Sequence, residues 1–108
     1  MNAEFRNVVS VDRVLHEPAR LMIAGLLFPV ESADFLFLVR ETRLTKGNLS
    51  SHLARLEEAG YVVIEKGYLG KVPHTVCRLS KAGRTAFRAY RAQIEKALRH
   101  LPRKGYSS

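Results

Sequence analysis

The spacing of apolar residues changes at Gly60, and this change constrains the folds open to the chain. Before Gly60, leucines recur at intervals of three and four residues, which is the period of an amphipathic helix. These leucines are Leu49, Leu53 and Leu56. After Gly60, the segments YVVIEKG (61–67) and TVCRLS (75–80) are rich in β-branched residues or alternate apolar with polar side chains, as strands do. Gly70 and Pro73 lie between them and are typical of a turn, so the sequence predicts a helix followed by a two-stranded hairpin.

Two helices joined by a tight turn are predicted just before the hairpin. Thr45 is a suitable N-cap for a helix over about Lys46–Ala59, and Gly60 suits the left-handed position after its last turn. Ser32 is a candidate N-cap for the preceding helix, Ala33–Thr42. The apolar run 35–39 would also suit a buried strand, but an acidic residue early in the segment and basic residues near its end favour a helix. About three residues separate the two helices, so they must cross at a steep angle, as in a helix-turn-helix.

Further helices are predicted on both sides of this unit. Residues 10–16 could form a short helix, and Glu17-Pro18 would interrupt it. The segment Pro18–Phe28 then reads as a largely apolar, buried helix. Ser80 caps a final helix over about Lys81–Leu101, whose apolar residues form one stripe. The stripe consists of Phe87, Tyr90, Ile94, Ala97, Leu98 and Leu101.

This order of elements predicts a mainly α fold with a small β-hairpin, namely a winged helix-turn-helix with an added C-terminal helix, about 81–101. The 108 residues suffice for a single domain, 1–108. The N-terminal segment lacks the apolar core of a signal peptide, and no apolar run approaches the length of about 20 residues that spans a membrane. The single cysteine, Cys77, excludes an internal disulfide framework and is expected in the core of a cytoplasmic protein.

Positive charge is concentrated in the second part of the chain. The net charge is +8, from 18 basic and 10 acidic side chains. Residues 1–41 carry four basic and six acidic side chains, a net charge of −2, so residues 42–108 carry a net charge of +10. A basic region on a small domain favours a polyanionic partner, nucleic acid before membrane, although a charged surface also serves solubility alone.

The predicted helix after Thr45 has the surface expected of a helix that enters the major groove of DNA. Its first turns carry small or basic side chains, with no carboxylate until Glu57 and Glu58. Gly47 would let the backbone approach a phosphate closely. The candidate DNA contacts on this helix are Lys46, Gly47, Asn48, Ser50, Ser51, His52 and Arg55. The candidates on the hairpin, which would contact the backbone or the minor groove, are Lys66, Tyr68, Lys71, His74, Thr75 and Arg78.

No pattern in the sequence indicates catalysis or metal binding. We find no nucleophile–base set, glycine-rich phosphate loop or pair of acids, so neither an enzyme nor a cofactor is expected. The four histidines and Cys77 lie far apart and share no ligand spacing. His52 lies beside the apolar stripe of its helix, where a phosphate contact and a half-buried packing role are both open.

Residues from about 10 to 95 resemble the small winged-helix transcriptional regulators related to the MarR and ArsR families. The most specific segments are GNLSSHLARLEEAGYV (47–62), GKVPHT (70–75) and LSKAGRTAF (79–87). The resemblance implies that 46–55 is the recognition helix, that 66–78 is the wing and that the terminal helices form a homodimer. The sequence lacks the Cys-x-Cys pair of the ArsR thiolate metal site, and it lacks the longer helices between which MarR proteins hold a small ligand.

The sequence therefore predicts a homodimeric, sequence-specific regulator of transcription that binds double-stranded DNA, a repressor rather than an activator. The distal stripe of the final helix is expected to be exposed and to pair about a twofold axis with the short first helix. The candidate dimer contacts are Val11, Val14, Leu15, Tyr90, Ile94, Leu98 and Leu101. Two alternatives are a winged-helix module that binds another protein instead of DNA, and a binder of RNA or single strands that stacks bases on aromatic residues such as Tyr68.

Overall fold

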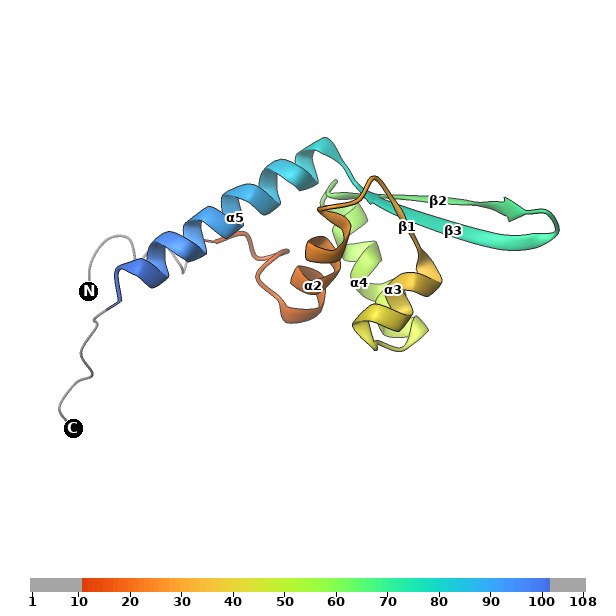
Figure 1. Ribbon diagram of the computed structural model, residues 1–108, viewed down its shortest axis with the longest axis horizontal. Coiled ribbons are helices and arrows are strands. Elements are labelled where there is room, and N and C mark those ends of the chain that lie inside the picture. Colours follow the sequence, from red (N-terminus) through yellow and green to blue (C-terminus); the bar gives the residue numbers. More distant parts are fainter. Residues whose placement is uncertain (1–10, 102–108) are drawn as a thin grey trace.

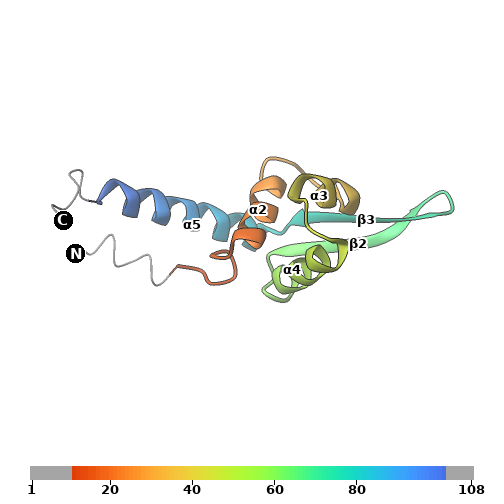
Figure 2. The same cartoon turned by 90° about the horizontal axis from the view of Figure 1, so that it is seen from below.

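The structure, a computed structural model, describes residues 11–101. The elements in chain order are α2 (Pro18–Leu27), β1 (Ala33–Asp34), α3 (Phe35–Thr42), α4 (Lys46–Glu58), β2 (Val62–Leu69), β3 (Val72–Leu79) and α5 (Lys81–Arg99). Figure 1 shows α2, α3 and α4 gathered near the base of the hairpin, with the hairpin and α5 projecting in opposite directions. In Figure 2, α4 lies next to β2, and α3 lies next to β3. The predicted mainly α fold with a small hairpin and an added C-terminal helix is confirmed.

The sheet has three antiparallel strands in the order β1-β3-β2, whereas the sequence predicts two. Strand β1 pairs with residues 76–77 of β3, which holds Ala33 and Asp34 in an extended conformation. Asp34 then caps α3, because its carboxylate accepts the backbone N–H of Phe37 at 2.7 Å. The predictions that Ser32 is the N-cap and that the helix begins at Ala33 are therefore wrong.

Residues 11–16 form turns instead of the predicted short helix. The Asp12 carboxylate accepts the backbone N–H groups of Val14 and Leu15, at 2.8 and 3.1 Å. The backbone N–H of His16 also donates to the Asp12 carbonyl, at 2.8 Å, so these bonds hold a single turn. The second carboxylate oxygen of Asp12 accepts the Tyr61 hydroxyl, and this bond together with burial raises the pKa of Tyr61 to about 12. The turn is thereby tied to the residue that precedes β2.

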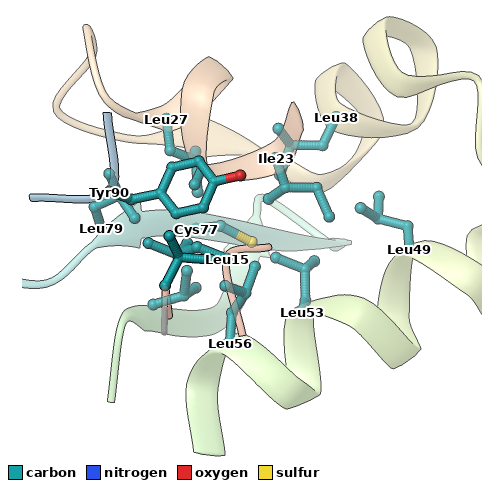
Figure 3. Packing of buried hydrophobic residues seen from close by; sticks show 13 residues of the cluster. Leu15, Ile23, Leu27, Leu38, Leu49, Leu53, Leu56, Cys77, Leu79 and Tyr90 are labelled. Carbon is teal, nitrogen blue, oxygen red and sulfur yellow. The ribbon is translucent and has the colours of Figure 1, made fainter. Parts of the chain in front are cut away.

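One apolar core joins the helices to the inner face of the sheet (Figure 3). The three leucines of α4 are buried, as predicted; Leu53 and Leu56 lie next to Leu15, and Leu49 lies on the side of Ile23 and Leu38. The opposite side of the core contains Ile23, Leu27, Leu38 and Tyr90. Cys77 is completely buried, and burial, reinforced by the charges of Glu57 and Asp34, raises the pKa of its thiol to about 11. The thiol is therefore protonated near neutral pH and serves packing, as the sequence predicts.

The ends of α4 and α5 follow local sequence signals. The hydroxyls of Thr45 and Ser80 cap these helices by accepting a backbone N–H of the first turn, at 3.1 and 2.9 Å. Gly60 has a φ of +81°, the left-handed conformation expected after α4. Only residues 43–45 separate α3 from α4. These features confirm the predicted helix-turn-helix and both predicted caps.

Candidate nucleic-acid interface

The exposed side of α4 carries most of the predicted helix contacts. Gly47, Ser51 and Arg55 are four residues apart and form one row along the helix, away from the buried leucines. Six of the seven predicted contacts are exposed: Lys46, Gly47, Asn48, Ser50, Ser51 and Arg55. No atom lies within 4 Å of the place that a Cβ at Gly47 would take, so packing within the chain does not require this glycine.

His52, the seventh predicted helix contact, is half-buried and bonded within the chain. Its Nδ1 lies 3.3 Å from a guanidinium nitrogen of Arg20, and its Nε2 lies 3.9 Å from a carboxylate oxygen of Glu17. A guanidinium can only donate, so Nδ1 is the acceptor in the contact with Arg20, and Nε2 faces Glu17. Arg20 also donates its Nε–H to the carbonyl of Val14 at 2.7 Å. His52 therefore has the half-buried position of the packing role, and its phosphate contact stays a prediction.

Glu17 and Arg20 contact His52 and so help to position α4, a role that the sequence alone does not indicate. The Glu17 carboxylate caps α2 by accepting the Arg20 backbone N–H at 2.8 Å. Burial acts to raise the pKa of Glu17, but this hydrogen bond and the nearby His52 and Arg20 outweigh it and lower that pKa below its usual value. Glu17 is therefore charged at neutral pH and holds the side of α4 against the start of α2.

The pairing register divides the predicted wing contacts between the two faces of the hairpin. Lys66 pairs with Thr75, and Tyr68 pairs with Pro73. These pairs continue the face whose base is buried in the core, so they lie on the same side as α4. The other predicted contacts that lie within the strands, His74 and Arg78, are on the outer face.

Some basic side chains of this surface are ion-paired within the chain, and others are not. Arg78 donates its Nε–H to Glu65 at 3.3 Å. Lys71 lies in the turn and is exposed. Four basic side chains on α4 and the hairpin form no ion pair within residues 11–101: Lys46, Arg55, Lys66 and Lys71. The positive charge of this surface is therefore open to an anionic partner.

A groove of ≈ 610 Å³ lies between α4 and the inner face of the hairpin. Its walls are formed by Phe35, Ser50, Leu53, Ala54, Glu57, Ile64, Lys66 and Thr75. The structure thus brings Ser50 together with Lys66 and Thr75, which the sequence predicts separately as helix and wing contacts. Glu57 also lines the groove, so its carboxylate disfavours an anion on that side.

Several predicted dimer contacts are covered within the single chain. Val11 is 5% exposed, Leu15 is 0% exposed and Tyr90 is 8% exposed. The Tyr90 hydroxyl is also hydrogen-bonded to Nδ1 of His16 at 2.8 Å. In this conformation these three residues have almost no surface left for a partner. Of the predicted contacts, the residues with accessible surface are Val14, Ile94, Leu98 and Leu101.

Residues 11–101 contain no group of three or more His, Cys, Asp or Glu side chains that could hold a metal ion. Among the helices between those limits, none combines the length and the apolar character needed to cross a bilayer.

Comparison with known proteins identifies the family. The model of the family described as winged helix DNA-binding domain matches residues 19–98 of this chain. The uncharacterized protein MJ0432 of Methanocaldococcus jannaschii is 33% identical over 82 residues, which cover 76% of this chain and 89% of that protein.

Solved structures share the fold. The transcriptional regulator homologue from Pyrococcus horikoshii OT3 superimposes with a TM-score of 0.82 at 26% identity, over 91% of this chain and 96% of that one. Streptococcus pneumoniae FabT, solved in complex with DNA, has a TM-score of 0.56 at 18% identity, over 89% of this chain and 73% of that one. The chain therefore belongs to the winged helix DNA-binding domain family, and the predicted relationship to transcriptional regulators of the MarR and ArsR kind is confirmed.

Proposed function

We propose that the protein is a homodimeric, cytoplasmic repressor of transcription that binds double-stranded DNA with sequence specificity. The observation that carries this proposal is the exposed side of α4, which has no carboxylate from Lys46 to Leu56 and lies across a groove from Lys66. The family, named for DNA binding, supports the same partner. FabT, whose structure was solved with DNA, shares the fold.

In the proposed complex, α4 enters the major groove with its N-terminal turns nearest the bases. Gly47 and Ser51 then face the base edges, and their small size allows the helix to lie deep in the groove. Arg55, at the far end of the same row, would contact a phosphate. Lys46, exposed in the first turn of α4, and Lys66, which lines the groove between helix and hairpin, would each contact a phosphate. Phosphate contacts fix the register of the protein on DNA, while base contacts determine which sequence is preferred.

Repression is the simplest regulatory role for such a molecule. A protein that occupies a promoter blocks it without needing any contact with the transcription machinery. Two copies related by a twofold axis would present two α4 helices to successive major grooves, so the preferred site should be a near-palindrome. Selection of bound duplexes from a random pool would identify that site.

Affinity for the selected duplex is expected to fall steeply as salt concentration rises. Four basic side chains per protomer, namely Lys46, Arg55, Lys66 and Lys71, would give about eight phosphate contacts and a slope of log K against log salt of about −7. The measurement is a binding titration at several salt concentrations, with single-stranded DNA of the same sequence as the control. Affinity that does not change with salt would contradict the nucleic-acid function. Preference for the single strand would instead favour the alternative that the protein binds RNA or single-stranded DNA.

Ser51→Glu is expected to abolish specific binding, a loss of at least about a hundredfold, because a carboxylate would face the acceptor-rich floor of the groove. Ser51→Gln is the matched control, since glutamine has nearly the same size and no charge. Ser51 is exposed, so both variants should unfold at the wild-type temperature. If Ser51→Glu binds the selected site as the wild type does, α4 is not the reading helix.

A further inference from the structure

Arg84 of α5 is bonded to the backbone at the end of α2. Its two terminal guanidinium nitrogens donate to the carbonyls of Phe28 and Val30, at 2.7 and 2.8 Å. Phe28 is the C-cap of α2, where backbone carbonyls have no partner within their own helix. The guanidinium carbon of Arg84 also lies over the Phe28 ring, 5.7 Å from its centroid. One side chain of α5 therefore holds the segment that leads from α2 to β1.

The first half of α5 is attached to the elements beneath it, and its distal end extends beyond them. The Phe87 ring packs on the Phe28 ring, with their centroids 4.9 Å apart, and the Tyr90 hydroxyl is hydrogen-bonded to His16. Figure 1 shows the distal end of α5 projecting away from the other helices, and Leu98 is 61% exposed there. The helix is therefore an arm that is held near its start and that would meet the partner copy near its end.

The angle of this arm controls how far apart the two α4 helices of the proposed dimer lie. Leu98 comes 14 residues after Arg84, a distance of about 21 Å along a helix. A tilt of about 10° at Arg84 would move that end by roughly 4 Å, and successive base pairs of DNA are about 3.4 Å apart. Two recognition helices fit one duplex only when their separation matches that of the half-sites. A change in the angle of α5 thus changes the half-site spacing that fits.

The contact of Arg84 is better suited to fix this angle than the other contacts of α5. Ser80 and Gly83 meet the residues before β2 at the very start of the helix, where a contact acts as a pivot. The contact of Phe87 with Phe28 is apolar and has no preferred direction. The two hydrogen bonds of Arg84 come from one planar group, so they fix both a distance and a direction.

We propose that Arg84 is a positioning residue that determines which half-site spacing the dimer recognises, because it holds α5 at a fixed angle to α2. This inference rests on the proposed function and adds a residue that acts on specificity without contacting the bases. When the arm is held, two linked α4 helices bind tightly at one spacing and weakly at others. When the arm is loosened, the dimer accepts several spacings and binds the best one less tightly.

The test replaces Arg84 by lysine and uses duplexes whose half-sites stand one or two base pairs closer or further apart than in the selected site. Lysine keeps the charge, but its ammonium lacks the rigid fork that holds both carbonyls. For the wild type, a change of one base pair should lower the affinity by at least about tenfold, since it also rotates one half-site by about 35°. For Arg84→Lys this loss should shrink to about threefold or less. Its affinity for a duplex with a single half-site should stay unchanged.

Arg88→Lys is the matched control, one turn later on α5. The Arg88 guanidinium carbon also lies over the Phe28 ring, 5.3 Å from its centroid. Within the described part of the chain, Arg88 forms no hydrogen bond or ion pair, so its replacement leaves the two carbonyl contacts of Arg84 in place. The spacing preference of Arg88→Lys should match that of the wild type. Circular dichroism and light scattering check the fold and the assembly of both variants.

The outcomes distinguish this inference from the function on which it rests. If the wild type does not bind duplex DNA as a dimer, the proposed function fails, and the role of Arg84 fails with it. If the wild type binds as a dimer and Arg84→Lys discriminates between spacings as strongly, only the role of Arg84 is overturned. A loss of affinity that is equal at all spacings and also affects the single half-site would overturn it too, because Arg84 would then support the fold of the DNA-binding surface.

Discussion

Gly83→Ala is expected to lower the free energy of unfolding by about 3 kcal/mol or more, because the added methyl group has no room. Gly83 is buried in the first turn of α5, where a Cβ would lie 2.1 Å from the carbonyl oxygen of Tyr61. That oxygen also accepts the backbone N–H of Ser80 at 2.9 Å. The Ser80 hydroxyl, which caps α5, donates to the carbonyl of Gly60 at 2.6 Å. The backbone cannot move away from the new methyl group without loss of these bonds.

Gly47→Ala is the matched control, since it makes the same change in the first turn of α4. No atom lies within 4 Å of its added Cβ, and alanine favours helix, so the fold should become more stable by up to about 1 kcal/mol. Thermal unfolding followed by circular dichroism measures both variants. The melting temperature of Gly83→Ala should fall by at least about 10 °C. Equal melting temperatures for Gly83→Ala and the wild type would show that α5 can shift away from Tyr61.

These two glycines illustrate which parts of the structure can be predicted from the sequence. Both stand early in a predicted helix, after a good N-cap, and the sequence does not distinguish them. The caps themselves are predictable because a hydroxyl and the N–H that it accepts are only three residues apart, as with Thr45 and Ser80. The close approach of Gly83 to Tyr61 depends on how α5 packs against the residue before β2. The sequence around Gly83 does not indicate this tertiary contact.

The errors in the predicted fold have the same origin. Ser32 and Asp34 are both good N-caps, and the choice between them depends on β3, more than 40 residues later in the sequence. A strand of two residues has no periodicity of its own and exists only because its partner is present. In the segment before α2, Asp12 is bonded to Tyr61, 49 residues away, a contact that the local sequence does not indicate.

The candidate site divides in a similar way. The exposed residues of α4 could be predicted because a helix places every third and fourth residue on one face. The sequence leaves residues 68–74 between the two predicted strands, and a gap of this length does not fix which residues pair. The pairing register decides which face of the hairpin Lys66, His74 and Arg78 occupy, so these faces could not be predicted. The contacts of His52 with Glu17 and Arg20 join α4 to the start of α2, more than 30 residues earlier.

Leu98→Arg is expected to convert the proposed dimer to a monomer, and the reason lies in how α5 extends from the domain. Leu98 is 61% exposed and Leu101 is 39% exposed, while Ile94, one turn before Leu98, packs partly against the core. Figure 1 shows this end of α5 projecting away from the other helices. A second copy of the chain, related by a twofold axis, would cover these leucines. An arginine at position 98 would then leave an unpaired charge in the contact.

Loss of the dimer should also remove specific DNA binding, because two α4 helices that bind one near-palindromic site gain affinity from being linked. Leu36→Arg is the matched control: Leu36 is 60% exposed on α3, so it adds the same charge at an equally accessible leucine outside α5. Light scattering should give a dimer for the wild type and for Leu36→Arg, and a monomer for Leu98→Arg. A binding titration of wild type and Leu98→Arg on the selected duplex then tests the link between assembly and affinity. A wild-type monomer at micromolar concentration, or a dimeric Leu98→Arg, would show that two copies do not meet through the end of α5.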